Sequence, residues 1–462
     1  MDEQKKLVYD QKEVKRILWK CDIRLIPFLS VLYLFSFLDR VNIGYTRIFE
    51  IEKDLNLTPS QFSSALSIFF LGYILFELPS NLMLKKTSPA TWLARIMITW
   101  GVITMCFSAV TNYSGLMAAR FFLGVFEAGL LPGIVYYLNN WYVRDEQGVR
   151  ISIFFTASSL AGAFGGLIAY GMAYLHNVGA LKAWQWLFII EGIPTVLLGV
   201  LVYFFLPSTV EDAKFLTQRE KEILKQRLLE SHSEVETAKI DKQQLINALK
   251  DFNTYLYMLC YFGIYTPIYS LSLLAPTIIS KFGFSPLTTI LLTVPAYGIA
   301  LFITPTVGWN SDRTRDRGTH MIAGAVVAIA GLFIVIFGNS GVVKYVGLLF
   351  ASIGLNTSLP TSMSWSNSNT IGATKLATVS ALTISFGNVG GAISGQFYRL
   401  EEAPNFYYSH GANIACMLIS IICAFILKYR FKKENDKLIL TESTDQDLGA
   451  LGDGIKGFRY ML

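Results

Sequence analysis

Two opposite charges stand side by side inside an apolar stretch of the chain. Asp39 and Arg40 lie in "SFLDRVNIGY", residues 36–45, within an apolar run that begins at Leu25. A charge at the centre of a bilayer costs about 2.5–3.5 kcal/mol or more, so such residues are rarely kept without a role. A desolvated carboxyl group can take up a proton, and a guanidinium can hold an anion. These residue types therefore favour proton and anion chemistry inside a membrane.

A second acid–base pair follows in a later apolar run. Arg120 and Glu127 are seven residues apart, which places both on one face of a helix, two turns apart. That face can meet the helix of Asp39 and Arg40, whose side chains point about 100° apart and so need different partners. The alternative is that these four residues only neutralise one another and fix helix packing.

Two further acidic residues, Glu77 and Glu191, are expected near span ends, where we assign them to packing. Arg120 is expected close to the outer end of its own span, and a substrate-binding role for it stays an alternative to packing.

The composition predicts an all-α membrane protein. Hydrophobic residues make up 53% of the 462 and charged residues 16%, against about 25% charged in soluble domains. The net charge of +6 is distributed between apolar runs, which does not indicate a nucleic-acid partner. The five cysteines and four histidines have no disulfide or metal-ligand spacing, so we expect no metal and no cofactor other than coupling protons.

Twelve segments are long and apolar enough to cross a bilayer. They are roughly 25–46, 60–83, 92–110, 116–138, 150–174, 186–206, 255–279, 287–309, 320–338, 344–364, 376–397 and 407–428. The predicted domains are a segment 1–24, a six-helix bundle 25–206, a linker 207–254, a second six-helix bundle 255–428 and a tail 429–462. In the linker, Thr217 and Glu220 have the capping-box spacing of an amphipathic helix.

Lysine and arginine gather in both terminal segments and in alternate loops, which predicts cytoplasmic termini. The sequons at Asn56 and Asn112 then fall on the outer side, and whether they are glycosylated stays open.

Four motifs carry a family resemblance across residues 20–430: "YLFSFLDRVNIGY" (33–45), "GYILFELPSNLMLKK" (72–86), "ARFFLGVFEAGLLPG" (119–133) and "WLFIIEGIPTVLLG" (186–199). They resemble the anion:cation symporters of the major facilitator superfamily, and more closely the fungal allantoate permease subfamily. "PIYSLSLLAPTII" (267–279) and "FRYML" (458–462) resemble the same subfamily.

The resemblance implies a proton-coupled symporter with the major facilitator fold, working by alternating access in the plasma membrane. Carried over by motif, Asp39 and Glu127 are the proton-coupling sites and Arg40 binds the substrate anion. Asn388 in "SFGNVGG" matches a substrate-site asparagine of bacterial members. The expected partners are a small organic anion, protons and the lipid bilayer, and the expected functional form is a monomer.

A loop motif of the superfamily is also present as "GWNSDRTRDRG" (308–318). It predicts a cytoplasmic latch in which Asp312 accepts hydrogen bonds from a helix N-terminus and from the nearby Arg313 and Arg317. In the corresponding motif of the first half, Asn81 stands where an aspartate is expected, so that latch should be weaker.

A tyrosine stripe in the seventh span bears on the substrate. Tyr257, Tyr261, Tyr265 and Tyr269 recur every four residues on one helix face. We assign Tyr257 to packing, and Tyr265 and Tyr269 to substrate contact or packing. One committed cation and aromatic walls suit a monocarboxylate with a flat or amide-bearing body, such as nicotinate or a related vitamin or nitrogen source.

Other classes of protein stay open to different degrees. A nutrient sensor of the same fold would need neither the carboxylates nor the latch. An enzyme is not expected, since no nucleophile–base pair or metal-ligand set lies at one depth. Within the resemblance, allantoate, ureidosuccinate, pantothenate, biotin and small peptides are alternative substrates.

Overall fold

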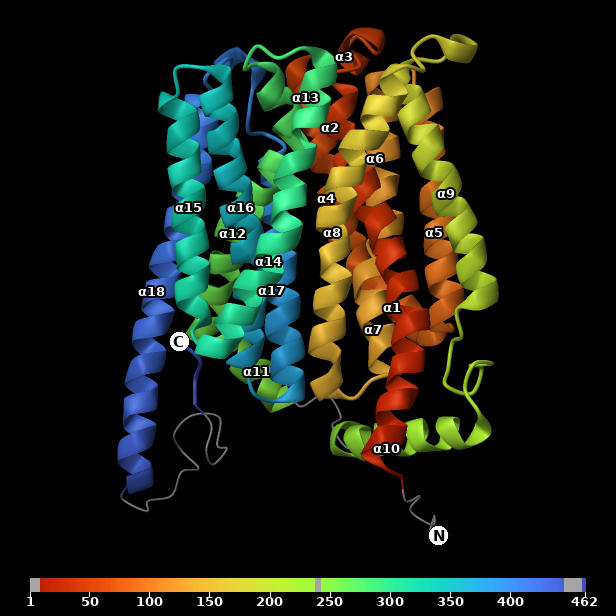
Figure 1. Cartoon of the computed structure of the whole chain (residues 1–462), viewed down its shortest axis with the longest axis vertical. Coiled ribbons are helices and arrows are strands. Elements are labelled where there is room, and N and C mark those ends of the chain that lie inside the picture. The colour runs from red at the N-terminus through yellow and green to blue at the C-terminus, as the bar shows by residue number, and fades with distance from the viewer. Residues whose placement is uncertain (1–8, 237–241, 444–458) are drawn as a thin grey trace. The chain divides into compact units, whose positions relative to one another are not determined.

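The computed structural model describes residues 9–236, 242–443 and 459–462, and every regular element in them is a helix (Figure 1). Eleven of these helical segments are long and apolar enough to cross a membrane. The remaining expected span, 150–174, corresponds to α8 (Arg144–Ala173), part of which lies outside the described side chains. Parts of the predicted terminal segments and linker, namely 1–8, 237–241 and 444–458, lie outside the described residues.

The first half of the chain, from residue 9 on, contains nine α-helices. They are α1 (Gln11–Val41), α2 (Ile43–Thr46), α3 (Ile51–Asp54), α4 (Pro59–Lys86), α5 (Pro89–Cys106), α6 (Tyr113–Glu127), α7 (Leu130–Asn139), α8 and α9 (Ala183–Phe205). Two expected spans are interrupted. The span predicted at 25–46 is split at Asn42, and the one predicted at 116–138 is split at Ala128 and Gly129. Hydropathy does not reveal these interruptions, because the apolar run continues through both.

The second half begins with the linker helices α10 (Gln218–Glu236) and α11 (Lys242–Lys250). It continues with α12 (Phe252–Ser280), α13 (Pro286–Leu292), α14 (Val294–Thr314), α15 (Arg317–Phe337), α16 (Gly341–Ser368), α17 (Ala373–Ser394) and α18 (Tyr407–Ser443). The span predicted at 287–309 is thus two helices, separated at Thr293.

The predicted capping box at the start of α10 is confirmed. The backbone N–H of Thr217 donates to Glu220 Oε2 at 2.9 Å, and the backbone N–H of Glu220 donates to Thr217 Oγ1 at 3.3 Å. Lys20 of α1 pairs with Glu220 at 2.6 Å, and Arg227 pairs with Glu146 of α8 at 2.6 Å. Ion pairs therefore attach α10 to the first-half helices.

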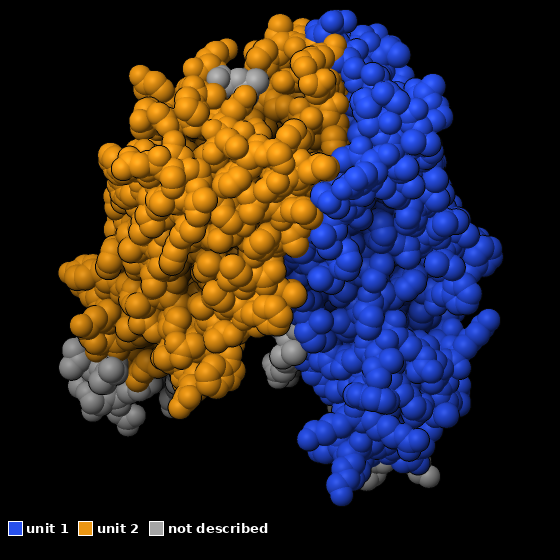
Figure 2. Space-filling view, turned by 45° about the horizontal axis from the view of Figure 1, so that its top comes forward, with its two compact units in different colours: residues 1–43, 54–56, 71–239 blue, residues 44–53, 57–70, 240–462 orange. Residues whose placement is uncertain are grey.

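The chain divides into two compact units, coloured separately in Figure 2. Unit 1 comprises residues 1–43, 54–56 and 71–239, and unit 2 comprises residues 44–53, 57–70 and 240–462. Two first-half segments thus belong with second-half helices. The hydroxyl groups of Tyr45 and Thr293 lie 2.8 Å apart, and Ser67 donates to the carbonyl oxygen of Ala392 at 2.6 Å. These contacts explain why 44–53 and 57–70 depart from the expected 25–206 bundle.

Candidate functional site

Five buried charged side chains lie in the interior of unit 1. Their relative exposures are 1% for Asp39, 6% for Arg40, 0% for Arg120, 0% for Glu127 and 1% for Glu191. They come from α1, α6 and α9, and we call them the charge cluster. Since fully buried charges are costly in a membrane interior, such a cluster is a candidate site.

Arg40 and Glu127 form the ion pair of the charge cluster. The Arg40 guanidinium donates to Glu127 Oε1, and the Ser36 hydroxyl donates to the same oxygen at 2.6 Å. The guanidinium also lies over the Tyr73 ring of α4, 5.1 Å from its centroid, where the face of the ring attracts a cation. The Glu127 carboxylate and the Tyr73 ring thus both hold the Arg40 guanidinium, and Glu77 also interacts with it electrostatically.

Asp39 faces a different helix from Arg40. Its Oδ2 accepts from the indole N–H of Trp100 and from the hydroxyl of Thr104 at 3.4 Å, and both donors belong to α5. The expectation that the adjacent charges have different partners is therefore confirmed. The hydrogen bonds to Asp39 come from neutral groups, whereas Glu127 has a guanidinium partner.

Glu191 belongs to the charge cluster, which differs from its expected place near a span end. It lies in the third turn of α9, and its Oε1 accepts from the side-chain amide of Asn42. Glu77, by contrast, is half-buried on α4. Asp39 and Glu191 repel each other electrostatically, and Arg120 interacts with Asp39 and Glu127.

The charge cluster contains three carboxyl groups and two guanidiniums. One oxygen of each carboxyl group, Oδ1 of Asp39, Oε2 of Glu127 and Oε2 of Glu191, is buried with no hydrogen-bond partner among the described residues. A protonated carboxyl group neutralises one charge and gains a donor. The arrangement can thus accommodate protons at more than one position.

Close helix contacts at glycine position the cluster. A Cβ atom on Gly192 of α9 would lie 2.4 Å from Met105 Cγ and 2.8 Å from the carbonyl oxygen of Gly101, so only glycine lets α9 approach α5 here. A Cβ atom on Gly129, two residues after Glu127, would lie 1.8 Å from Ser80 Oγ. These contacts hold α9 and the interruption of the fourth span close to α5 and α4.

The three candidate substrate contacts of unit 2 lie together. The Tyr265 hydroxyl donates to the Tyr269 hydroxyl at 3.0 Å and to Asn388 Oδ1 at 3.3 Å. The Tyr269 ring meets Phe70 edge-on at 4.9 Å between centroids. Tyr257 is buried against Trp365 and Phe431, in keeping with its assignment to packing.

The predicted latch residues differ in their roles. Arg317 donates to Asp312 Oδ1 at 2.8 Å and also to Ser364 and Ser368 at the end of α16. However, Asp316, not Asp312, caps the N-terminus of α15, accepting from the backbone N–H of Thr319 at 2.9 Å.

The expectation that Asp312 accepts from a helix N-terminus was therefore wrong, because α15 begins at Arg317 and Asp312 lies in the last turn of α14. Asp316 also pairs with Lys428 of α18 at 2.8 Å. Arg313 lies over the Trp309 ring at 5.5 Å, and Asn81 is half-buried on α4 in unit 1.

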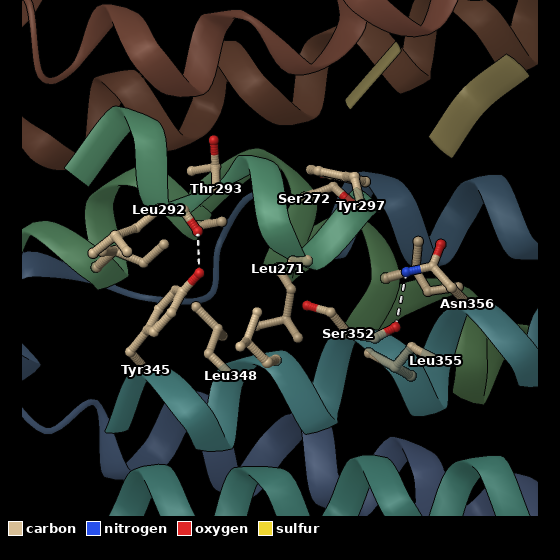
Figure 3. A pocket seen from close by; sticks show the side chains of 15 residues that line it. Leu271, Ser272, Leu292, Thr293, Tyr297, Tyr345, Leu348, Ser352, Leu355 and Asn356 are labelled. Atoms are coloured by element: carbon tan, nitrogen blue, oxygen red, sulfur yellow. Dashed lines mark hydrogen bonds between the residues drawn. The ribbon is translucent and has the colours of Figure 1, made fainter. Parts of the chain in front are cut away.

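A small pocket lies in unit 2 between α12, α13, α14 and α16 (Figure 3). Most of its lining is aliphatic. Two of the labelled polar side chains bond to backbone carbonyls: Tyr345 donates to Leu292 at 2.9 Å, and Asn356 donates to Ser352 at 2.8 Å. This pocket has no charged lining residue and does not include Tyr265, Tyr269 or Asn388.

The neutral side chains that donate hydrogen bonds to the carboxyl groups of the charge cluster were not predicted from the sequence. Ser36 and Asn42 lie in the same short stretch as Asp39 and Arg40, so their proximity along the chain was a usable signal. Trp100 is a weaker sequence signal for a hydrogen-bond partner, since an indole N–H inside a span needs an acceptor. The α9–α5 contact that brings in Glu191 has no signature in a single sequence.

Comparison with known proteins identifies the superfamily. Residues 29–395 match the Major Facilitator Superfamily. The chain is 34% identical to the MFS transporter prlL of a fungal species (strain NRRL 50135), over 96% of this chain and 91% of that protein. It is 31% identical to the major facilitator-type transporter hxnP of Emericella nidulans, over 98% of this chain and 94% of that protein.

Solved structures agree on the fold. A bacterial homologue of the human lysosomal transporter Spinster, in an inward-facing conformation, has a TM-score of 0.69 and 15% identity, covering 88% of this chain and 97% of that chain. A D-xylose–proton symporter has a TM-score of 0.67 and 14% identity, covering 88% of this chain and 96% of that chain. The chain is a multi-pass membrane transporter, and it belongs to the Major Facilitator Superfamily.

Proposed function

We propose that the protein is a proton-coupled symporter that imports a small organic anion, a monocarboxylate such as nicotinate, by alternating access. The observation that carries this proposal is the buried pair of Arg40 and Glu127 beside Asp39. It joins a fixed cation to carboxyl groups that can be protonated. The resemblance to the anion:cation symporters and to the allantoate permease subfamily supports the same function.

The proposed coupling is a competition for Arg40. In the structure, the Glu127 carboxylate accepts a hydrogen bond from the Arg40 guanidinium. A substrate carboxylate can take that place only if Glu127 leaves, and a carboxylate without its cation in a buried site favours the neutral, protonated form. Substrate binding to Arg40 and protonation of Glu127 therefore promote each other. Release of the proton restores the ion pair and expels the anion.

Charge balance supports a proton requirement. With both guanidiniums and all three carboxylates ionised, the charge cluster carries one excess negative charge, which one proton neutralises. An entering monoanion adds a second negative charge. A second proton is then needed to keep the buried site neutral. Asp39, whose hydrogen-bond donors Trp100 and Thr104 are neutral, is the proposed second carrier.

Several further features are part of the proposal. Tyr265, Tyr269 and Asn388 supply hydroxyl and amide groups for the body of the substrate. Both termini are cytoplasmic, the protein works as a monomer, and it resides in the plasma membrane. The latch of Asp312 and Arg317 ties α14 to α15 and opens during the transport cycle.

Uptake of labelled nicotinate by expressing cells tests the proposal at external pH 5, with and without a protonophore. Proton symport predicts uptake above that of control cells, which collapses with the protonophore. If the protein is at the surface and uptake matches the control, allantoate, pantothenate, biotin and small peptides are tested in the same way. Failure of the whole set would favour a nutrient sensor.

A further inference from the structure

Residues 459–462 lie against one end of unit 2, which we call the latch end. It comprises residues 312–319, where α14 ends and α15 begins, together with the end of α16 and the adjoining part of α18. The backbone N–H of Gly318, in the first turn of α15, donates to the Leu462 oxygen at 3.0 Å. This segment includes most of the "FRYML" motif, and none of its residues belongs to the charge cluster.

Two asparagine side chains bind the backbone of this segment. Asn435 of α18 accepts from the N–H of Tyr460 at 2.8 Å and donates to its carbonyl oxygen at 2.8 Å. Asn369, directly after α16, accepts from the N–H of Met461 at 2.7 Å and donates to its carbonyl oxygen at 2.9 Å. Each carboxamide thus satisfies both backbone groups of one residue, as a neighbouring strand does when a peptide adds to a sheet edge.

The side chain of Tyr460 packs against an aromatic surface. The Tyr460 ring stacks on Phe431 of α18, with 4.9 Å between centroids and 4° between planes. Phe431 in turn packs edge-on against Trp365 of α16 at 6.0 Å, and the Trp365 indole N–H donates to the carbonyl oxygen of Met461 at 2.9 Å. With the segment in place, Trp365 and Phe431 are 0% and 2% exposed.

The same residues hold the end of α16 in place. A Cβ atom on Gly318 would lie 2.9 Å from Trp365 Cζ2 and 2.9 Å from Lys428 Cδ, which shows how closely α15, α16 and α18 meet here. Arg317 joins α15 to Ser364 and Ser368 of α16, and Lys428 joins α18 to Asp316. The bound segment adds contacts to all three helices.

We propose that the latch end is a peptide-binding site for residues 459–462, and that the bound segment fastens the end of α16 to α15 and α18. Its backbone is held by Asn369 and Asn435, and its tyrosine by Phe431. Without the segment, Trp365 and Asn369 lose their hydrogen-bond partners in it, and the end of α16 loosens. Transport then slows because unit 2 no longer moves as one body, while the concentration of substrate for half-maximal uptake stays unchanged.

Hydrogen–deuterium exchange of the purified full-length protein tests the binding without any knowledge of the substrate. In the unaltered chain, the amides of Tyr460 and Met461 should exchange slowly. The double variant Asn369→Ala, Asn435→Ala should exchange them about tenfold faster or more, since four hydrogen bonds are lost. The stretch 364–369 should also exchange faster. The control is Asn367→Ala, because Asn367 accepts from Ser380 at 3.0 Å and not from the segment.

A second pair of variants separates docking from misfolding. Tyr460→Phe keeps the ring that stacks on Phe431 and should preserve slow exchange, whereas Tyr460→Ala should lose it. Exchange of 459–462 at the rate of a free peptide in the unaltered chain would overturn the proposal. So would faster exchange of the segment in the double variant with no change in residues 364–369, because the segment would then not fasten α16.

Discussion

Arg40 and Glu127 form a buried ion pair in which each residue lies at the end of a helix. Arg40 is one residue before the end of α1 at Val41, and Glu127 is the last residue of α6. Both expected spans continue after a short interruption, as α2 and α7. The residues at both breaks keep right-handed helical backbone angles, so Arg40 and Glu127 lie within the candidate spans 11–46 and 113–138.

Replacing Glu127 by Gln should uncouple transport. The amide is close in shape to the carboxyl group but cannot take up or release a proton. We expect accumulation of the transported anion against its gradient to be lost, while exchange of internal for external substrate persists. Counterflow and net uptake, measured on the same vesicles, separate these two activities. Net accumulation at the unaltered level would contradict the role of Glu127, and Glu222→Gln, at an exposed position on α10, is the control.

Replacing Arg40 by Ala should remove anion binding. The substitution deletes the guanidinium that lies against Glu127 and Tyr73 and leaves a buried carboxylate without its cation. We expect binding of an anionic substrate to weaken by at least tenfold, in line with about 1.5–3 kcal/mol for a charged hydrogen bond. A neutral analogue of the same substrate should lose much less. The control is Arg95→Ala, because Arg95 is exposed on α5.

Equal losses for the anionic and neutral compounds would point to a folding defect. Thermal stability of the purified variant distinguishes that outcome from a specific loss of binding. Arg40→Lys keeps the charge but not the planar guanidinium, so it should recover only part of the affinity.

Trp100 should be needed to hold Asp39. Trp100→Phe removes the indole N–H and deprives the buried Asp39 carboxyl group of a hydrogen bond, which costs about 1–3 kcal/mol. We expect a lower unfolding temperature in detergent and reduced proton-driven uptake. Trp309→Phe is the control, since the Trp309 side chain is 62% exposed. Identical unfolding temperatures for the two variants would exclude a structural role for this hydrogen bond.

Gly129 should tolerate no side chain. A Cβ atom there would lie 1.8 Å from Ser80 Oγ, so Gly129→Ala must displace α4 or α7. Overpacking of this kind costs about 1–3 kcal/mol, and we expect lower thermal stability and lower transport. Gly171→Ala, on α8, has nothing within 4 Å of the new atom and should resemble the unaltered protein. Adding Ser80→Gly to Gly129→Ala should restore part of the loss, and its failure to do so would reject the clash as the cause.

Attachment of α10 should depend on pH through Glu220. Burial pushes the pKa of Glu220 upward, but the hydrogen bond from Lys20 and the backbone N–H of Thr217 outweigh it, so the pKa lies below its usual value. A carboxyl group with a lowered pKa stabilises the folded arrangement above its unfolded pKa, about 4.3. That stabilisation is lost as the pH falls through the lower, folded pKa.

The distance between spin labels on Lys15→Cys and Glu222→Cys, both exposed positions on α1 and α10, measures this attachment. The distance should be constant near neutral pH and broaden at acid pH. Glu220→Gln should give the broadened distribution at every pH. A distribution that is unaffected by both acid and Glu220→Gln would show that this ion pair does not hold α10, and Glu434→Gln on α18 serves as the control.

The sequence predicted the helical spans and the charged residues well because both leave strong local signals. Apolar runs of about 20 residues can only be buried or cross a membrane, and an Asp-Arg pair inside one of them is costly enough to stand out. The spacing of Arg120 and Glu127 correctly placed both on a buried face, because helical periodicity is a local property.

The interruptions and the neutral partners depend on contacts between helices. The apolar sequence around Gly129 does not indicate that Ser80 packs against it. The sequence around Glu191 does not indicate that the Asn42 amide donates to its carboxyl group. The exchange of roles between Asp312 and Asp316 has a similar origin. Asp312 lies in the last turn of α14 and Asp316 lies in the short link that follows, so the position at which α15 begins decides which of them caps the helix.

The central claim is that an anion and protons enter together through Arg40 and Glu127. Its most direct test is internal pH in vesicles that contain the purified protein, recorded with a trapped dye as nicotinate, pantothenate, biotin or allantoate is added outside. We expect acidification with at least one of these anions, and none with Arg40→Ala or Glu127→Gln. Uptake of a labelled anion without acidification, or acidification that is unchanged in both variants, would contradict the claim.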